Sequence, residues 1–335
     1  MTDAGRRGTV IVGAGLMGTW HAHALKAAGL AVVAVVDTDL ARAKQLAKRC
    51  RAAASERLAD ALEHRPFAVH VCTPPDSHLE VLSASLDAGA HCLVEKPFAP
   101  DAATARRMLE LAEQRTLLAC PVHQFLFQRG IERVHRAVME FGPLLHADFV
   151  ACSAGAIAGG DSPERRARLA LDILPHPLSL LRRLLGRPLD VSDWAVAIPA
   201  PGEVRVAGIA GTVSVGILLS ATGRPTRNTA RFIGEHGTMH VDLFHGFATF
   251  ESPRVSRIRK ITRPFSASAA TLAGAAANLA VRLARREPAY PGLRELVTAF
   301  YAAAEVGKPG PITPAETIDV ADAGDRLAAR ITAAR

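Results

Sequence analysis

The stretch TVIVGAGLMG, Thr9–Gly18, decides the fold of this chain. Its apolar, β-branched beginning is typical of a buried strand, and three glycines follow at once and open a helical pattern that runs to Ala28. In Gly-x-Gly-x-x-Gly, the first glycine permits a tight turn, the second lets the backbone approach a pyrophosphate, and the third lets helix and strand pack closely. The N–H groups at the helix N-terminus favour phosphate binding. We therefore predict a dinucleotide-binding loop formed by Gly13, Ala14, Gly15, Leu16, Met17 and Gly18.

A carboxylate follows the second strand-like run, at the position where a dinucleotide-binding loop requires one. The second apolar run, 31–36, ends at Asp37, which is followed by Thr38. A carboxylate at this position accepts hydrogen bonds from the ribose hydroxyls of NAD and repels the 2′-phosphate of NADP. Arg42 could reach a 2′-phosphate, although an arginine here is also typical of a solvated helix face. The pattern favours NAD over NADP as the cofactor.

The first third of the chain alternates between two kinds of pattern. Strand-like runs cover 9–12, 31–36, 68–72, 91–94 and 117–122, and helical runs cover 16–28, 40–49, 55–63, 77–88 and 100–115. This alternation is typical of βαβ units and a parallel sheet. We predict an α/β dinucleotide-binding Rossmann domain with a doubly wound parallel sheet over residues 1–122.

The pattern changes after residue 122. Period-two runs cover 146–151, 191–198, 204–210, 213–221, 229–234 and 238–243, and helical runs cover 130–141, 177–185, 293–306 and 314–334. Period-two runs separated by turn residues favour an antiparallel sheet with helices on one side. We predict a second domain over residues 123–335, of class α+β with a mainly antiparallel sheet, whose last helix could pack back on the first domain.

Composition limits the location of the protein. The chain has 335 residues, of which 49% are hydrophobic and 21% charged, as in globular proteins. The longest alanine-rich run, 267–284, is interrupted by Asn278 and Arg282, so we expect neither a membrane span nor a membrane partner. The N-terminus lacks a signal-peptide pattern, and the five cysteines form no Cys-x-x-Cys pair. We expect a cytoplasmic protein with reduced thiols.

Charge and histidine content argue against polyanion and metal binding. The net charge is +8, but the arginines are scattered and aromatic residues make up 5%, so we expect no nucleic-acid partner. The basic run 254–263 would suit a phosphate-bearing substrate, although a solvated face is the more typical account. The thirteen histidines form no recognisable ligand set, so we expect no required metal.

Two further loops are expected at the carboxyl ends of strands, where open α/β sheets bind ligands. One contains Thr73, Pro74 and His78, and the other contains Glu95 and Lys96 followed by a proline. A lysine whose pKa is lowered by burial can move a proton. We expect both loops to border the cofactor.

Asp172 and His176 are candidates for acid/base chemistry in the second half. They lie four residues apart, a spacing that can align them on one face of a helical turn. A histidine near a carboxylate is a plausible acid/base pair at neutral pH. Asp172 as a helix cap and His176 as a packing residue is the structural alternative.

Together these residues resemble the Gfo/Idh/MocA oxidoreductases, over nearly the whole chain and including Gly234–Thr238. The resemblance implies an open sheet in the second domain that binds substrate and forms homodimers or homotetramers. It also implies NAD(P)-dependent oxidation or reduction of a carbinol or ketone on small molecules such as sugars and cyclitols. It further implies Lys96 and His176 as the catalytic acid/base candidates, Asp172 as an orienting or substrate-binding carboxylate, and Gln124 beside the nicotinamide.

The chain departs from the family pattern around the histidine. Leu174 replaces a glycine, Ser179 stands where a second aspartate is common, and 168–171 is not glycine-rich. These changes suggest a larger or partly apolar substrate, such as an intermediate of specialised metabolism. An imine or enamine reductase, a redox-assisted hydrolase or lyase that retains NAD, and a non-catalytic NAD(H)-binding regulator remain open alternatives.

Overall fold

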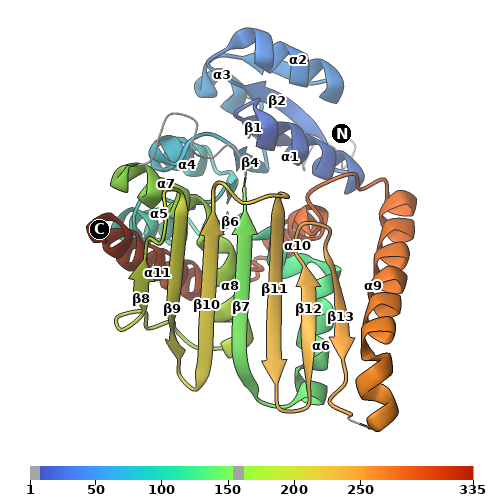
Figure 1. The fold of residues 1–335 in the computed structure, drawn as a ribbon. Coiled ribbons are helices and arrows are strands. Elements are labelled where there is room, and N and C mark those ends of the chain that lie inside the picture. The colour runs from blue at the N-terminus through green and yellow to red at the C-terminus, as the bar shows by residue number, and fades with distance from the viewer. Residues whose placement is uncertain (1–7, 154–161, 255, 335) are drawn as a thin grey trace. The chain divides into compact units, whose positions relative to one another are not determined.

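The computed structural model describes residues 8–153, 162–254 and 256–334. They form two compact units, which Figure 1 shows as ribbons. The first unit is the chain up to His123 together with Leu293–Asp322, and the second is Gln124–Gly292 together with the chain from Ala323 onward. The assignment of these parts to cofactor and substrate binding stays a prediction.

The first unit contains a six-stranded parallel sheet. Its strands are β1 (Thr9–Val12), β2 (Val32–Val36), β3 (Ala53–Ser55), β4 (Ala68–Val71), β5 (His91–Val94) and β6 (Ala119–Pro121). Their order is β3-β2-β1-β4-β5-β6, so the direction of winding reverses between β1 and β4. At such a switch point, ligands bind beyond the carboxyl ends of the strands. The predicted Rossmann fold is confirmed.

Helices pack on this sheet through apolar residues. They are α1 (Leu16–Ala27), α2 (Leu40–Cys50), α3 (Leu58–Leu62), α4 (His78–Asp87, after the 3-10 turn η2, Pro75–Ser77), α5 (Ala102–Gln114), α10 (Leu293–Glu305) and the first part of α11 (Pro314–Ala333). Val10, Val69 and Val94 on the strands share one buried cluster with Leu82 of α4 and Met108 of α5. Ile318 and Ala321 of α11 pack against this cluster, and Tyr301 of α10 contacts Thr9 of β1, so these late helices complete a core that begins near the N-terminus.

The second unit contains a seven-stranded sheet. Its strands are β7 (Leu144–Cys152), β8 (Ala195–Ala197), β9 (Glu203–Ala210), β10 (Val213–Ser220), β11 (Arg227–Gly234), β12 (Gly237–Asp242) and β13 (Phe247–Glu251), in the order β13-β12-β11-β7-β10-β9-β8. Only the β7–β10 pair is parallel among the pairings of these described strands. The mainly antiparallel sheet predicted from the period-two runs is confirmed.

One face of this sheet is buried and the other is open. The helical elements of the unit are η3 (Gln124–Phe127), α6 (Arg129–Phe141), α7 (Pro163–Ile173), α8 (Pro175–Leu185), α9 (Arg257–Arg285) and the end of α11. Trp194 is buried against the inner face, where Gly208 leaves room for it: a Cβ at Gly208 would lie 2.2 Å from the indole. Alternate residues such as Ile209 point to the other face and are exposed.

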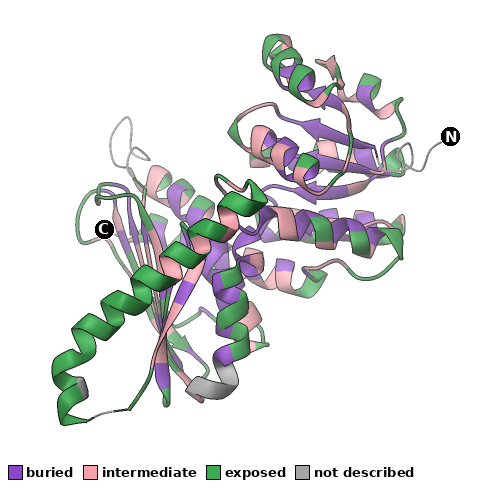
Figure 2. Cartoon of the chain, turned by 90° about the vertical axis from the view of Figure 1, so that its right-hand side faces the viewer, coloured by how far each residue is buried: buried purple, intermediate pink, exposed green. Residues whose placement is uncertain are grey.

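Two expectations from the sequence are corrected. The run 55–63, expected as one helix, is the end of strand β3 followed by the shorter helix α3, because pairing of β3 with β2 extends the parallel sheet. Helix α9 was not expected, and its segment Lys260–Arg285 is long and apolar enough to cross a membrane, judged by length and composition alone. Figure 2 shows most of α9 exposed.

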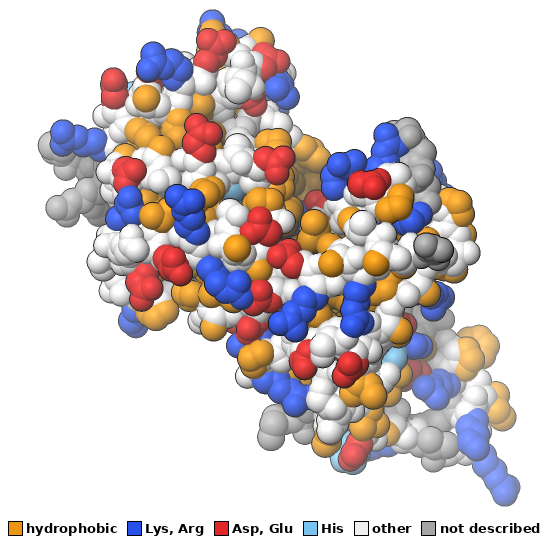
Figure 3. Space-filling model, turned by 90° about the vertical axis from the view of Figure 1, so that its left-hand side faces the viewer, with side chains coloured by type: hydrophobic (Ala, Val, Ile, Leu, Met, Phe, Trp, Pro, Cys, Tyr) orange, Lys and Arg blue, Asp and Glu red, His pale blue; other side chains and the backbone are white. Residues whose placement is uncertain are grey.

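Charged side chains of both signs are mixed on one face of the molecule. On the face that Figure 3 shows, basic and acidic side chains are interspersed rather than gathered into one patch. Such interspersion does not provide the continuous basic stripe that tracks a nucleic-acid backbone.

Candidate functional site

The glycine loop between β1 and α1 has the geometry of a phosphate cradle. Gly13 has φ +98°, and a Cβ there would lie 2.5 Å from the carbonyl oxygen of Cys72. A Cβ at Gly18 would lie 1.9 Å from the carbonyl oxygen of Gly13, whereas one at Gly15 would meet nothing within 4 Å. The first and third glycines are therefore needed for packing, and the second leaves open space at the helix N-terminus, beside Leu16, which is 67% exposed. These residues fit a dinucleotide.

Asp37 fastens the end of β2 to this loop. Its Oδ2 accepts a hydrogen bond from the backbone N–H of Ala14 (2.7 Å), and its Oδ1 accepts one from Asp39 N–H (2.9 Å). Arg42 pairs with Oδ1 of Asp37 at 3.2 Å and with Asp39 at 3.1 Å. Arg42 thus lies at the carboxylate that we predict to determine cofactor choice, while Thr38 is exposed beside it.

The loop after β4 is held by His78. This side chain is fully buried, with Nε2 2.8 Å from the carbonyl oxygen of Thr73 and Nδ1 3.1 Å from that of Phe98. The hydroxyl of Thr73 accepts a hydrogen bond from Ser77, and Pro74 is exposed. His78 therefore joins two loops at the sheet edge through their backbones, while Thr73 and Pro74 lie nearer the surface.

Glu95 and Lys96 follow β5 at the same edge. Glu95 is 4% exposed, and its Oε2 accepts a hydrogen bond from the backbone N–H of Lys96 at 3.1 Å. Lys96 itself is half-buried. Burial and the charge of Glu95 hold the pKa of the nearby Cys72 thiol well above its ordinary value, so this thiol stays neutral.

Behind Glu95 lies a buried hydrogen-bonded chain that sequence reasoning missed. His21 Nε2 is 2.9 Å from Oε1 of Glu95, and His21 Nδ1 is 2.8 Å from Nδ1 of His70. Tyr301 OH is 3.4 Å from His70 Nε2 and 2.5 Å from the hydroxyl of Thr9. The available signal was His21 three residues after Gly18 on the inner side of α1, but nothing local placed His70 or Tyr301 beside it.

Hydrogen-bond chemistry decides which atom donates at each step of this hydrogen-bonded chain of side chains. A carboxylate only accepts, so His21 donates through Nε2 and accepts at Nδ1 from His70. His70 then accepts at Nε2 from the phenol of Tyr301. Burial, together with the neighbouring His21, holds the pKa of His70 well below its ordinary value, which agrees with a neutral ring. The chain ends on Glu95 and holds its carboxylate beside the backbone of Lys96.

The second unit contains the other predicted acid/base residues. His176, in the first turn of α8, is 8% exposed and stacks on Phe125 of η3, with ring centroids 4.2 Å apart. Gln124 of η3 is 5% exposed, and among the described residues its buried Oε1 has no hydrogen-bond partner. An amide oxygen in that state is suited to receive a donor from a ligand.

Asp172 lies near the end of α7, whereas His176 lies in the first turn of the next helix, α8, and Leu174 stands between the two helices. Leu174 has helical angles (φ −55°, ψ −32°), but Pro175 and Pro177 lack the N–H groups that would continue the hydrogen-bond ladder, so α8 begins anew. Asp172 is exposed whereas His176 is buried. The structure thus brings His176 to Phe125, and the pairing of Asp172 with His176 stays a prediction.

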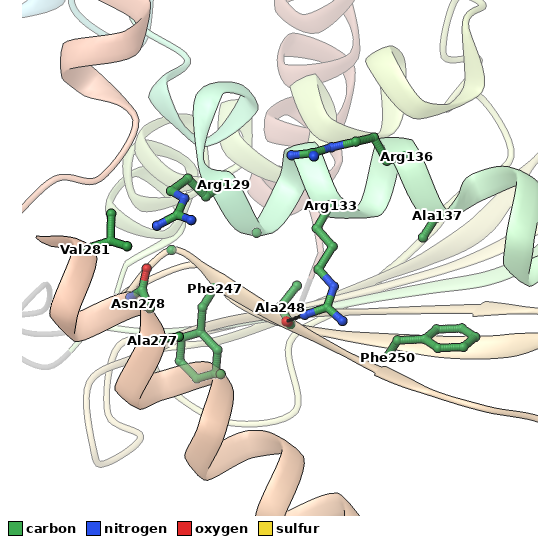
Figure 4. A pocket seen from close by; sticks show the side chains of 13 residues that line it. Arg129, Arg133, Arg136, Ala137, Phe247, Ala248, Phe250, Ala277, Asn278 and Val281 are labelled. Atoms are coloured by element: carbon green, nitrogen blue, oxygen red, sulfur yellow. Dashed lines mark hydrogen bonds between the residues drawn. The ribbon is translucent and has the colours of Figure 1, made fainter.

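A cavity of about 500 Å³ lies between α6, β13 and α9 (Figure 4). Arg129, Arg133 and Arg136 line it from α6, and Arg133 donates to the carbonyl oxygen of Ala248 at 3.0 Å. Figure 4 shows Asn278 and Val281 of α9 on the opposite side. Within the described ranges, no group of three or more His, Cys, Asp or Glu side chains could hold a metal ion.

The sequence model of the Gfo/Idh/MocA family, an oxidoreductase family with an NAD-binding Rossmann fold, matches residues 7–123. The chain is therefore similar to this family over residues 7–123, about a third of its length. The matched region contains the parallel sheet of the first unit, and the expectation of NAD as the cofactor is confirmed by this match.

Two relatives of the chain have named activities. UDP-N-acetylglucosamine 3-dehydrogenase of Acidithiobacillus ferrooxidans is 33% identical over 196 residues, which cover 56% of this chain and 58% of that protein. Inositol 2-dehydrogenase of Leifsonia xyli subsp. xyli is 32% identical over 182 residues, or 53% of each chain. In sequence, the chain therefore spans little more than half the length of these relatives.

A solved structure extends the likeness to both units of the chain. The structure of the Acidithiobacillus ferrooxidans UDP-N-acetylglucosamine 3-dehydrogenase matches with a TM-score of 0.77 and 18% identity, over 98% of both chains. At this identity the likeness establishes the shared fold.

Proposed function

We propose that this protein is an NAD-dependent oxidoreductase that transfers hydride between the nicotinamide and a carbinol or ketone carbon of a sugar-like, cyclitol or specialised-metabolite substrate. One observation carries the proposal. The open space at Gly15, the carboxylate of Asp37 and the Glu95–Lys96 pair all follow strands of one parallel sheet, at its carboxyl edge. That edge is where such sheets bind a dinucleotide.

The glycine loop and Asp37 hold the cofactor in this proposal. The uncapped N-terminus of α1 directs N–H groups at the pyrophosphate, since no side chain caps it and its first turn has no acidic residue. Asp37 accepts the ribose hydroxyls and keeps the loop in place through Ala14. Bound NAD supplies the hydride acceptor, and NADH the hydride donor, at the nicotinamide ring.

Lys96 moves the hydroxyl proton of the substrate. Its backbone is fixed by Glu95, and Glu95 is fixed in turn by His21, so the loop that carries the ammonium group is held in place. His176 is the second acid/base candidate, with its ring held against Phe125, and Asp172 would orient the substrate or the histidine. Gln124 offers its buried amide oxygen to the nicotinamide or the substrate.

The names of the relatives support the substrate class. One acts on a nucleotide sugar and the other on a cyclitol, and both are named for the oxidation of one carbinol carbon. Leu174 and the prolines beside His176 give this chain an apolar wall next to its candidate acid/base residue. We therefore propose a substrate with an apolar or bulky part next to the reacting carbon.

The test has two steps. Titration with NADH and with NADPH, followed by nicotinamide fluorescence, should give tighter binding of NADH because of Asp37. Turnover is then screened on UDP-sugars, cyclitols and their keto forms. Lys96→Ala should lower kcat by about 100-fold or more without changing the Kd of NADH. His176→Ala in parallel shows which residue carries the larger share. Binding of neither dinucleotide, or undiminished turnover of both variants, would reject the proposal.

A further inference from the structure

Helix α9 exposes a row of large apolar side chains. Ile258, Ile261, Phe265, Leu272, Leu279 and Leu283 are each between 58% and 77% exposed. Four of them recur every seven residues, which is about two helical turns, so they lie on one side of the helix. Figure 2 shows that α9 is exposed rather than buried in its unit. We call this row the apolar stripe of α9.

The apolar stripe lies opposite the side of α9 that contacts its own sheet. A Cβ at Gly274 would lie 3.3 Å from Thr249, Asn278 donates to the carbonyl oxygen of His245 at 2.9 Å, and Arg263 pairs with Glu251 at 2.5 Å. At about 100° per residue, Leu272 and Leu279 lie about 160° and 140° around the helix from Gly274. Contacts within the unit therefore leave the apolar stripe uncovered.

The inner side of α9 is itself loosely packed. Two cavities border it, of about 500 Å³ toward α6 and about 750 Å³ toward β12 and the loop after β13. Figure 4 shows the first of these between Phe247 of β13 and the arginines of α6. Core packing of α9 thus does not explain its apolar composition.

The distribution of charged residues around α9 indicates the kind of surface that the apolar stripe would contact. The segment 254–286 contains no acidic residue and eight basic ones: Arg254, Arg257, Arg259, Lys260, Arg263, Arg282, Arg285 and Arg286. They cluster at both ends of the helix, and the apolar stripe contains none. An apolar face flanked by lysine and arginine is the pattern of a helix that lies in the interface of an anionic bilayer.

A second copy of the chain fits this surface less well. Two α9 helices packed along their stripes would bring the basic ends of one beside the basic ends or the uncharged middle of the other, with no carboxylate on either helix to pair. A bilayer with anionic headgroups matches both features at once, because it offers negative charge at the flanks and hydrocarbon at the stripe.

The contacts of α9 within its unit favour a position on the surface of a bilayer rather than across it. The bonds of Arg263 with Glu251, of Asn278 with His245, and of Arg282 with the carbonyl oxygens of Glu287 and Pro288 tie both halves of α9 to its own unit. A transmembrane position would break them and bury charged groups in hydrocarbon. We propose that α9 binds the surface of an anionic phospholipid bilayer through its apolar stripe, which makes this chain a peripheral membrane protein.

The proposal is tested with the full chain and vesicles of stated composition. Purified protein is mixed with vesicles of phosphatidylcholine alone or with 30% phosphatidylglycerol, at 0.1 M and 0.5 M salt, and the bound fraction is measured by flotation. We expect binding to the anionic vesicles only, weakened by about tenfold or more at the higher salt, where exposed charges are screened within a few ångströms.

Matched variants separate the stripe from a general charge effect. Phe265→Asp with Leu272→Asp should lower the partition coefficient at least tenfold. Ser266→Asp with Ala273→Asp adds the same charge one residue further on, away from the stripe, and should retain most of the binding. The midpoint of thermal unfolding of each variant verifies that the fold is intact, and this control does not depend on the substrate or on the proposed function.

Three outcomes would overturn the proposal. Absence of binding to anionic vesicles at 0.1 M salt is the first. Equal loss in both pairs of variants is the second, since it would show attraction of charge alone. The third is a dimer, detected by light scattering, that dissociates only in the Phe265→Asp, Leu272→Asp variant, since the stripe would then be covered by a second copy.

Discussion

Asp37 makes different contacts through its two oxygens. Oδ2 holds the backbone of Ala14, while Oδ1 faces Asp39 N–H and the guanidinium of Arg42. The ion pair with Arg42 lowers the net negative charge that a 2′-phosphate would meet. We therefore expect the choice between NAD and NADP to depend on the balance of these two side chains, and the sequence alone showed only that both were near.

Substitution of this pair should separate their effects. Asp37→Ala removes hydrogen bonds to a charged acceptor, so the Kd of NADH should rise about 10- to 100-fold, while the Kd of NADPH changes less. Arg42→Ala leaves the carboxylate uncompensated and should weaken NADPH further with little change for NADH. Fluorescence titration of the two variants measures all four constants. Unchanged constants for Asp37→Ala would remove it from the cofactor site.

His70 predicts how stability depends on pH. Its pKa is lowered in the folded state, so below its ordinary value of 6.5 the unfolded chain takes up a proton that the folded chain resists. Stability from this group is complete above that pH and is lost as pH falls further. Burial also lowers the pKa values of His91 and His135, which act in the same direction.

The measurement is the midpoint of thermal unfolding between pH 8 and pH 5. The wild-type midpoint should fall below about pH 6.5, and His70→Gln should reduce that fall without removing it. His64→Gln, at an exposed position, is the matched control and should behave as the wild type. An identical pH profile for His70→Gln and the wild type would show that the ring titrates freely in the folded protein.

At the scale of elements, the sequence best predicted those strands and helices whose apolar spacing agrees with their packing in the fold. Strands β1 and β4 and helices α1 and α5 combine regular apolar spacing with glycine or proline boundaries, so their residues and their parallel order could be predicted. Helix α9 could not be, because its exposed side is apolar and no polar outer face revealed its period. The chain from Glu95 to Thr9 was also beyond sequence reasoning, since its members lie up to 292 residues apart.

The glycines of the β1–α1 turn offer a test at this scale. In Gly18→Ala, the new methyl group would lie 1.9 Å from the carbonyl oxygen of Gly13, so the turn must open, at a cost of about 1–3 kcal/mol or more. In Gly15→Ala, the methyl group enters open space at an ordinary φ of −74°, so the fold is kept.

Thermal unfolding and NADH titration distinguish the two glycine variants. Gly18→Ala should lower the midpoint of unfolding by several degrees. Gly15→Ala should keep its midpoint within a degree or two and weaken NADH binding at least tenfold, because the methyl group occupies the space proposed for the pyrophosphate. If Gly15→Ala bound NADH as the wild type does, the phosphates would have to lie elsewhere.

At the scale of the whole molecule, the proposed acid/base residues are divided between the units. Lys96 belongs to the first, and His176, Asp172 and Gln124 belong to the second. The stacked pair of His176 and Phe125 lies within the second unit, and the Glu95–Lys96 pair within the first. Each half of the proposed chemistry can thus be examined by substitution within a single unit.

The open face of the seven-stranded sheet predicts association of the whole chain. Ile209 is 67% exposed on β9, directly opposite Ser214 of β10, and Leu218 is half-buried on the same side. An exposed sheet face that carries large apolar side chains marks a contact surface. We expect a homodimer or homotetramer through this face.

Light scattering after size exclusion should give a multiple of the 35.4 kDa chain mass. Ile209→Asp should shift the protein toward the monomer, because it places a charge in the apolar contact. Val306→Asp changes an equally exposed apolar residue at the end of α10, outside the sheet, and should leave the mass unchanged. A monomeric wild type, or dissociation by both variants alike, would contradict an interface on the open sheet.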